Sequence, residues 1–185
     1  MNLDDPRAQR TRARLREAIL ELVAEQDLDA ITISAVAKCA GINRATVYQH
    51  YPDVHALVVD AMDGPIAEVA RAVRVCPADA PPDRAPEALA GLFEHIAARA
   101  AVYRCALGDQ GSAGFAGRMR EQVTAALAER FHEGKRPTGF DDVPVDVHAA
   151  YLAGALLGVV THWITGERPA PASELAAAFW RLFRA

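Results

Sequence analysis

The sequence predicts an all-α protein with two parts, a three-helix N-terminal domain (residues 1–58) and a larger helical domain (residues 59–185). Apolar residues recur at the spacing of amphipathic helices through most of the chain. No segment alternates apolar and polar residues with the β-branched enrichment that is typical of a strand. Two short helical segments separated by Gly41 lie within the first part, which is the pattern of a helix-turn-helix.

The composition is that of an ordinary soluble protein, with 51% hydrophobic and 24% charged residues and a formal net charge of −4. This acidic balance argues against binding of nucleic acid or anionic membranes over the whole surface, although it leaves room for a local basic patch. The start of the chain has no apolar run and does not resemble a secretory signal. Three dispersed cysteines without a CxxC motif fit a reducing cytosol, so we expect a cytoplasmic protein, with redox sensing as a less favoured alternative.

The first predicted helix covers residues 14–26, where apolar side chains follow one face and acidic side chains lie elsewhere. The segment "DLDA" (residues 27–30) then ends it. An arginine-rich lead-in precedes this helix and contributes Arg7, Arg10, Arg12 and Arg14.

The next two predicted helices are short. Thr32 or Ser34 can cap the first of them, which continues through "SAVAKCA" and ends before Gly41. Asn43 is a good N-cap for the second, "RATVYQHY", and Pro52 stops it.

The rest of the chain is also predicted to be helical. Asp53 can cap a helix that runs to residue 76, with a kink expected at Gly64–Pro65. A proline-rich linker, "PADAPPDRAPEAL", follows it. Beyond the linker we expect helices near residues 86–106, 112–134, 145–165 and 172–184.

The second short helix has an apolar inner face and a polar outer face. Val47 and Tyr51 continue the apolar face that Val36 and Ala37 begin, with Ile42 at the turn. The residues left to face outward are Arg44, Ala45, Thr46, Tyr48, Gln49 and His50.

This outward set suits duplex DNA. Arg and Gln can hydrogen-bond base edges, and a small Ala lets a helix approach the groove floor and contact a thymine methyl group. Thr, Tyr and His supply donors for phosphate oxygens, to which a helix N-terminus also points its positive dipole. The alternatives are a helical protein-interaction module or a small-molecule-binding module without DNA binding, in which this surface is only solvated.

These residues resemble the TetR family of transcriptional regulators. The resemblance rests on "RAQRTRARLREAILELVAEQ" followed by "ITISAVAKCAGINRATVYQHYPDVHAL", with the pair Tyr48 and Tyr51, then Pro52 and Leu57, at the family's positions. The last 35 or so residues, from Tyr151, also look like the final two helices of the family's regulatory domain.

The resemblance implies a homodimer that binds a double-stranded operator and is in most cases a repressor released by a small apolar ligand, with no cofactor. The helix after the reading helix would shift on ligand binding. The family resemblance and the outward positions of the second short helix together give the expected DNA-contacting residues. They are Thr32, Arg44, Ala45, Thr46, Tyr48, Gln49, His50 and His55.

Two residues depart from the family pattern, and the N-terminal domain is not basic. Both features lower the expected affinity for DNA. Val54 stands where the family usually has a phosphate-contacting Lys, and Ala45 where it often has Gly. Residues 1–60 hold seven Lys and Arg but nine Asp and Glu, a net charge of −2, with the arginines gathered at the start. We therefore expect modest affinity and a shallow salt dependence.

The larger domain is apolar enough to house a ligand cavity. Tyr103, Tyr151 and His148 are candidate polar handles within it, although satisfied core residues would look the same in the sequence. The candidate ligand-binding set is Phe93, Ile96, Tyr103, Leu107, Met119, Val123, His148, Tyr151 and Leu152.

Neither a metal site nor an enzyme is expected. His95, His148 and His162 lack the close spacing of a ligand set. GxSxG, P-loop and HExxH motifs do not occur, and the glycine-rich "GDQGSAGFAG" follows a helix rather than a strand. No catalytic residue and no cofactor are therefore assigned.

The C-terminal helices (residues 145–184) are the expected dimer interface. Small residues at positions 150, 154, 155 and 158 would let two helices approach closely, with large apolar residues near the C-terminus beside them. Residues 147–164 approach membrane length, but they contain two His, a Tyr and a Thr, so we expect a buried or interface helix and no membrane contact.

Overall fold

The computed structural model describes residues 5–77, 80–81, 83–108, 113–167 and 170–183. All regular elements in these ranges are helices, which confirms the predicted all-α class. They are α1 (Pro6–Glu25), the 3₁₀ turn η1 (Leu28–Ala30), α2 (Ile33–Ala40), α3 (Arg44–His50), α4 (Val54–Ala61), α5 (Asp63–Val75), α6 (Glu87–Ala98), α7 (Ala100–Leu107), α8 (Ala113–His132), α9 (Val145–Thr165) and α10 (Ala172–Phe183).

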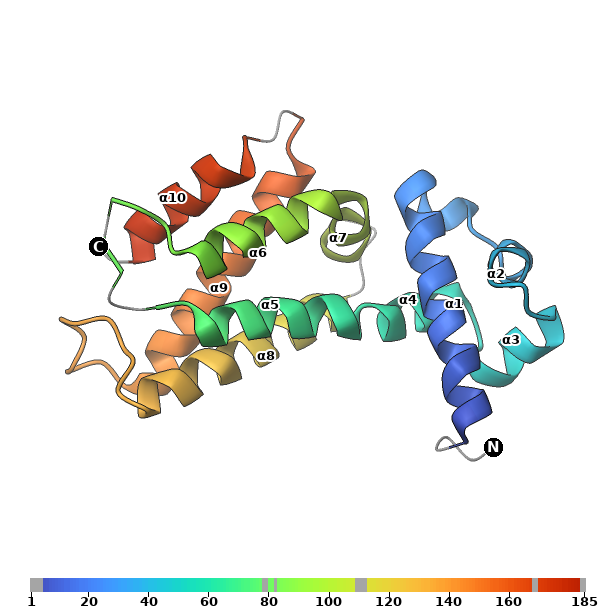
Figure 1. Ribbon diagram of the computed structural model, residues 1–185, viewed down its shortest axis with the longest axis horizontal. Helices are drawn as coiled ribbons and strands as arrows, with labels where there is room; N and C mark the ends of the chain where they lie inside the picture. The colour runs from blue at the N-terminus through green and yellow to red at the C-terminus, as the bar shows by residue number, and fades with distance from the viewer. Residues whose placement is uncertain (1–4, 78–79, 82, 109–112, 168–169, 184–185) are drawn as a thin grey trace.

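The helices form two groups that lie end to end along the long axis (Figure 1). The reader end is α1–α4, in which α1 packs on α2 and α4, and α3 packs on α2. The regulatory end is α5–α10, in which α8 packs on α5 and α9 while α6 packs on α10. Helix α4 leads into α5, and α7 contacts α1 across the junction. The predicted division after residue 58 falls within α4 and stays a prediction.

The first helix begins earlier than the sequence pattern predicts. Asp5 accepts a hydrogen bond from the Arg7 backbone N–H at 2.9 Å, and Pro6 occupies the first turn, where a missing N–H costs nothing. The arginine-rich segment is therefore helical, and its side chains are fixed in direction relative to the rest of α1.

Two predicted long helices are each divided. The expected kink at Gly64–Pro65 is a break at Met62, about one turn earlier, because the proline ring crowds the carbonyl of the residue four positions before it. The helix expected near residues 86–106 breaks at Arg99, after which α7 turns to pack on α1 while α6 stays on α10.

The core of the regulatory end is aromatic at its centre. The Phe93 ring lies 5.8 Å from Trp163 and 6.1 Å from Phe179, centroid to centroid. Within the described ranges, α9 is the one helix long and apolar enough to cross a membrane by length and composition, and 50% of its apolar stretch is buried inside the chain.

Candidate nucleic-acid interface

Local hydrogen bonds fix the turn between α2 and α3. Thr32 caps α2 by accepting from the Ala35 N–H at 3.1 Å, and Asn43 caps α3 by accepting from the Ala45 N–H at 2.9 Å. Between the helices Gly41 has φ 63°, the left-handed conformation that favours glycine. The predicted caps and the glycine turn are confirmed, so the angle between the two helices is set by short-range chemistry.

Helix α3 presents one face to the protein and one to solvent. Val47 is fully buried against α2, while Arg44, Ala45, Tyr48 and Gln49 are exposed. Thr46 is half-buried at the edge of the exposed face. The structure thus brings these five predicted side chains together on one turn and a half of a single helix.

Arg44 and Tyr48 lie one helical turn apart and contact each other. The Arg44 Nη2 donates to the Tyr48 hydroxyl at 3.3 Å, and the guanidinium lies 5.5 Å from the centre of the Tyr48 ring. Such a pair restricts both side chains while it leaves most guanidinium donors free. The outward surface of α3 is therefore partly pre-organised.

The remaining predicted contacts differ in quality. His55 is exposed in the first turn of α4, and Thr32 is exposed although its oxygen is engaged as a cap. His50 is half-buried, and its Nδ1 is buried with no hydrogen-bond partner among the described residues. Burial, with a smaller contribution from Arg12, lowers the pKa of His50, which favours its neutral form.

Three arginines of α1 are engaged inside the protein. Arg14 donates to the Ala40 carbonyl at 2.6 Å, which anchors the end of α2 on α1. Arg12 and Arg16 pair with Asp60 of α4 at 2.9 and 3.8 Å. The sequence pattern grouped Arg7, Arg10, Arg12 and Arg14 as one basic lead-in, whereas Arg7 and Arg10 are exposed without an internal partner among the described residues and Arg14 is exposed but bonded to Ala40.

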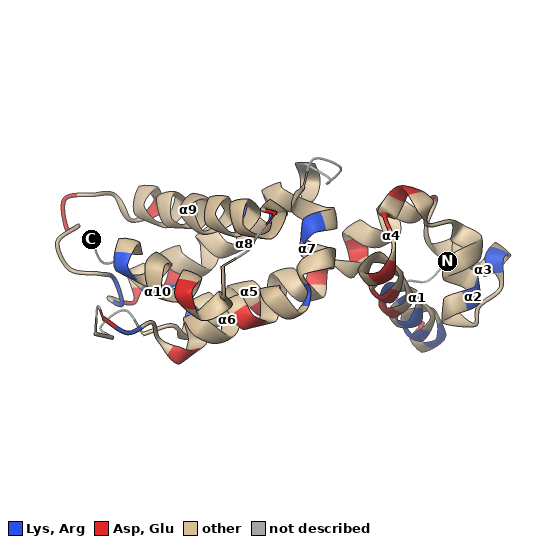
Figure 2. Ribbon diagram, turned by 90° about the horizontal axis from the view of Figure 1, so that it is seen from above, with Lys and Arg blue, Asp and Glu red and all other residues tan. Residues whose placement is uncertain are grey.

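The charge of the reader end is polarised. In Figure 2 blue positions gather on the N-terminal half of α1 and on α2 and α3, whereas red positions lie on the later turns of α1 and on α4. A negatively charged duplex would therefore meet a favourable potential on the side of α3 and not on the side of α4.

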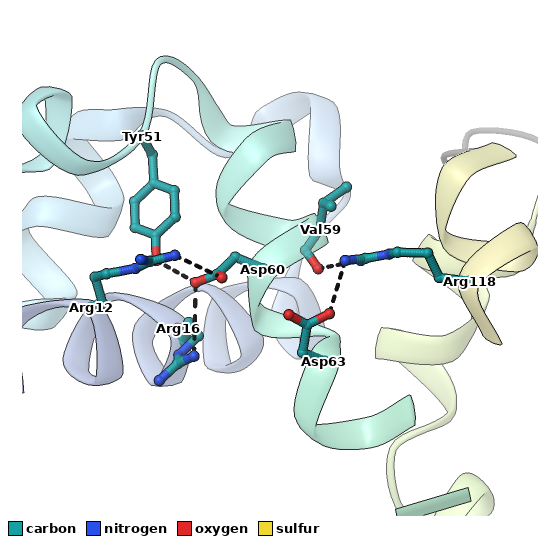
Figure 3. A network of polar contacts seen from close by, with 7 residues as sticks. All are labelled: Arg12, Arg16, Tyr51, Val59, Asp60, Asp63 and Arg118. Carbon is teal, nitrogen blue, oxygen red and sulfur yellow. Dashed lines mark hydrogen bonds and ion pairs between the residues drawn. The ribbon is translucent and has the colours of Figure 1, made fainter. Parts of the chain in front are cut away.

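A buried polar network holds α4 against α1 (Figure 3). The Tyr51 side chain, which is 3% exposed, donates its hydroxyl hydrogen to Asp60 and accepts from the Arg12 Nε at 3.2 Å. Burial and the hydrogen bond to Asp60 raise the pKa of Tyr51 to about 12, so it stays a neutral donor. This network fixes the end of α3 relative to α1 and α4.

Arg118 of α8 reaches the opposite side of α4 (Figure 3). It donates to the Val59 carbonyl at 2.6 Å and to the Asp63 carboxylate at 2.9 Å. The sequence analysis missed both Asp60 and Arg118. A charged Asp60 within the apolar segment "VHALVVDAM" was the one available signal, because such a residue requires a partner.

The regulatory end contains an apolar cavity between α5, α6, α8, α9 and α10. It is small, with about 40 Å³ open to a water-sized molecule, and it is partly continuous with solvent. Of the predicted ligand-binding set, Val123 and Leu152 line it. Leu89 and Leu92 also line it, together with Val73, Phe179 and Arg130. The sequence pattern did not indicate a role for Arg130.

The other predicted ligand-binding residues lie elsewhere. Phe93, Ile96, Tyr103 and Met119 are fully buried in the packed core, and Leu107 is half-buried at the end of α7. None of the three proposed polar handles borders the cavity.

Each of those handles is engaged or exposed. The Tyr103 hydroxyl donates to the Pro65 carbonyl at 3.3 Å. His148 accepts from Arg136 at 3.0 Å and lies against Phe140, while Tyr151 is 69% exposed on the outer face of α9. Tyr151 was therefore placed wrongly in the interior, because its helical position was read as a core position. No cluster of three potential metal ligands occurs among the described residues.

A capped helix-turn-helix with an exposed, donor-rich second helix, carried on a helical body, defines a helix-turn-helix transcriptional regulator. The family described as "Bacterial regulatory proteins, tetR family" matches residues 15–61, and the one described as "Transcriptional regulator C-terminal region" matches residues 83–184. The second match spans more than half of the chain. The chain therefore belongs to the TetR family of DNA-binding transcriptional regulators.

Individual relatives agree with this assignment. An uncharacterized HTH-type transcriptional regulator of Mycobacterium tuberculosis, Rv2250c, is 32% identical over 63 residues, which is 34% of this chain and 33% of that protein. The uncharacterized HTH-type regulator YxbF of Bacillus subtilis is 39% identical over 66 residues, 35% of this chain and 17% of that protein. The chain thus matches a third or less of the length of these curated relatives.

The fold is shared more widely than the sequence. The structure of the regulator FadR from Bacillus subtilis in complex with stearoyl-CoA superimposes with a TM-score of 0.65 at 16% identity, over 94% of this chain and 97% of that one.

Proposed function

We propose that this regulator acts as a homodimer on a palindromic operator and is a repressor that a small apolar ligand releases. The exposed set on α3 carries the proposal, because its inner face is locked by Val47 and its outer face has donors without a protein role. We place it in the cytoplasm, where duplex DNA and reduced cysteines coexist, and assign it no catalytic role.

The side chains of α3 divide into two tasks. Arg44 and Gln49 have the length and donor geometry to read base edges in the major groove. Tyr48 and Thr46 can donate to phosphates and so fix the register of the helix, as can Thr32 and His55 on the flanking elements. The methyl group of Ala45 permits close approach to the groove floor.

The outer surface of α9 and α10 supports dimerisation through residues 145–184. Val147, Tyr151 and Leu182 are 58%, 69% and 70% exposed, which is unfavourable for large apolar side chains unless a partner covers them. A Cβ added at Gly154 or Gly158 would meet nothing within 4 Å, so a second helix can approach there. A two-fold pair of these helices would form a four-helix interface.

The two networks on α4 provide a route between the ends. Arg118 ties the start of α5 to α8, and Asp60 ties α4 to α1 and to Tyr51 at the end of α3. A ligand that moves α5 or α8 would move α4 through Arg118, and α4 would carry the reader end with it. The division of the chain after residue 58 would then separate two bodies that α4 connects.

The reading role is tested with an operator obtained by selection. Arg44→Ala and Gln49→Ala should relax specificity at particular base pairs, whereas Tyr48→Phe should weaken binding to all sequences to a similar extent. Unchanged operator affinity in both Arg44→Ala and Tyr48→Phe would contradict the assignment and favour a helical module without DNA binding.

The dimer has its own test. Light scattering coupled to size exclusion at micromolar protein should give twice the chain mass. A monomeric mass would contradict the interface on α9 and α10. Val147→Glu together with Tyr151→Glu should produce that monomer, since both side chains lie on the proposed interface.

A further inference from the structure

One buried charge at the regulatory end lacks a counter-ion. Arg130 is 6% exposed and lies on the face of α8 that also carries Met119, Val123 and Leu127, all turned toward the interior. Its Nη1 donates to the Val73 carbonyl at 2.7 Å, while its Nε is buried with no hydrogen-bond partner among the described residues. Arg130 is one of the residues that line the apolar cavity.

Nearby acidic residues form no ion pair with this guanidinium among the described residues, although Glu133 attracts it from a longer distance. No carboxylate of the described residues lies within 4.0 Å of it, and the two closest along α8 have other partners. Glu129 pairs with Arg74, and Glu133 pairs with Lys135, both at the surface.

Cys76 is the remaining titratable group beside Arg130 in the cavity wall. Burial raises the pKa of the Cys76 thiol to about 11, so it is neutral near pH 7 and offers no negative charge. The carbonyl of Val73 near the end of α5 supplies a partial negative charge, which is less than a guanidinium requires.

Burial of an unpaired cation costs free energy because the charge loses its hydration, so buried cations usually have an anionic or hydrogen-bonding partner. Around Arg130 the other walls are aliphatic or aromatic, including Leu89, Leu152 and Phe179. A molecule that satisfies this site must therefore combine one anionic group with an apolar body. A cation would be repelled, and a neutral alcohol would leave the charge without a counter-ion.

We propose that the cavity binds an apolar carboxylic acid in its ionised form, with the carboxylate oxygens accepting hydrogen bonds from Arg130 and the hydrocarbon body held among the apolar walls. This inference rests on the proposed ligand response and names the chemistry of that ligand. Trp180 lines the cavity and donates through Nε1 to the Pro81 carbonyl at 2.8 Å.

Calorimetric titration of the full-length protein with octanoate, 1-octanol and octylamine tests the proposal. Octanoate should bind at least about tenfold more tightly than octanol, because only the acid forms a charge-assisted hydrogen bond, and octylamine should bind more weakly than both. Arg130→Met should remove this preference and leave octanol binding unchanged. Arg74→Met, which removes an exposed arginine at the same end of the molecule, should retain it.

The comparison of octanoate with octanol on the unaltered protein keeps the test valid if Arg130→Met fails to fold. Arg130→Lys, which retains the charge, then serves as the second variant and should keep the preference for the acid. Equal binding of octanoate and octanol, or no binding of octanoate by folded protein, would overturn the proposal. Because DNA binding is measured separately, that result would leave the reading function intact, whereas loss of DNA binding alone would leave the ligand assignment intact.

Discussion

The reader end and the regulatory end treat buried polar groups differently. At the reader end, the Tyr51 hydroxyl has both a donor and an acceptor partner, and Arg14 donates to the Ala40 carbonyl at the end of α2. At the regulatory end, Arg130 borders a cavity with its Nε unsatisfied among the described residues. The first arrangement is complete without a ligand, and the second is not.

This difference indicates that DNA binds at the surface of the reader end and that a small molecule binds in the interior of the regulatory end. The reader end uses its internal hydrogen bonds to hold α3 as a rigid element, and the donors of Arg44 and Gln49 lie on its outer face, although His50 Nδ1 is buried there without a partner among the described residues. The regulatory end has its unsatisfied donor inside. DNA would thus be bound by a surface that is already formed, whereas a small molecule would complete an interior.

Removal of the central acid of the reader network should have the largest effect. Asp60→Ala leaves the buried Tyr51 hydroxyl hydrogen without its acceptor and removes the carboxylate that pairs with Arg12 and Arg16, and loss of a partner costs about 1–3 kcal/mol for a buried group. We expect the free energy of unfolding to fall by about 3 kcal/mol in urea titrations followed by circular dichroism. Glu68→Ala removes an exposed pair with Arg71 and should leave stability unchanged. An equal loss in both variants would show that the network is no stronger than a surface pair.

The second largest effect is a loss of DNA affinity with no change in the stability of the protein. Arg44→Ala should weaken binding to the selected operator by about 2 kcal/mol, as expected for a base-reading arginine, and should leave the melting temperature unchanged because Arg44 is exposed. Fluorescence anisotropy with a labelled duplex measures the affinity. Arg71→Ala, an exposed arginine on α5, is the matched control and should bind as the unaltered protein does.

A smaller effect follows from the turn. Gly41→Ala should cost about 1–2 kcal/mol of stability, because φ 63° is unfavourable for an L side chain. The new Cβ would also lie 3.0 Å from the Arg14 Nη2. Gly91→Ala in the middle of α6 meets nothing within 4 Å and should instead stabilise the protein by about 0.5–1 kcal/mol. Opposite signs in thermal denaturation are the expected result, and two changes of the same sign would contradict it.

The smallest effect is a dependence of stability on pH. Burial, with a contribution from Arg136, lowers the pKa of His148 below its usual 6.5. The unfolded chain then binds the proton more readily than the folded one, so this stability is complete above about pH 6.5 and is lost as the pH falls through the folded pKa. His50 and His95 act in the same direction.

Melting temperatures at pH 7.5 and 5.5 measure this dependence. His148→Gln should reduce the difference between them, whereas His55→Gln, which alters an exposed histidine, should not. A larger acid sensitivity in His148→Gln would reverse the assigned sign.

The parts of the fold that depend on neighbouring residues could be predicted. Thr32, Gly41 and Asn43 act within three residues of their own position, so their roles were readable in the sequence. The break at Arg99 was not, because α7 turns there to reach α1, a contact between residues far apart in the chain.

The same distinction applies to the sites. The outward face of α3 follows from helical periodicity alone, whereas the internal roles of Arg12 and Arg14 depend on Asp60 and Ala40, 48 and 26 residues away. Arg130 could have been found, since it continues the three-to-four-residue spacing of Met119, Val123 and Leu127 along α8. The sequence analysis considered only aromatic and histidine side chains as polar handles there and so passed over it.

The claim that α3 reads DNA is tested most directly by selecting bound sequences from a random duplex library with the purified protein at moderate salt. The account predicts an enriched palindrome with half-sites about one helical turn or a little more apart, as a two-fold pair of reading helices requires. Failure of a folded, dimeric protein to enrich any sequence would contradict it.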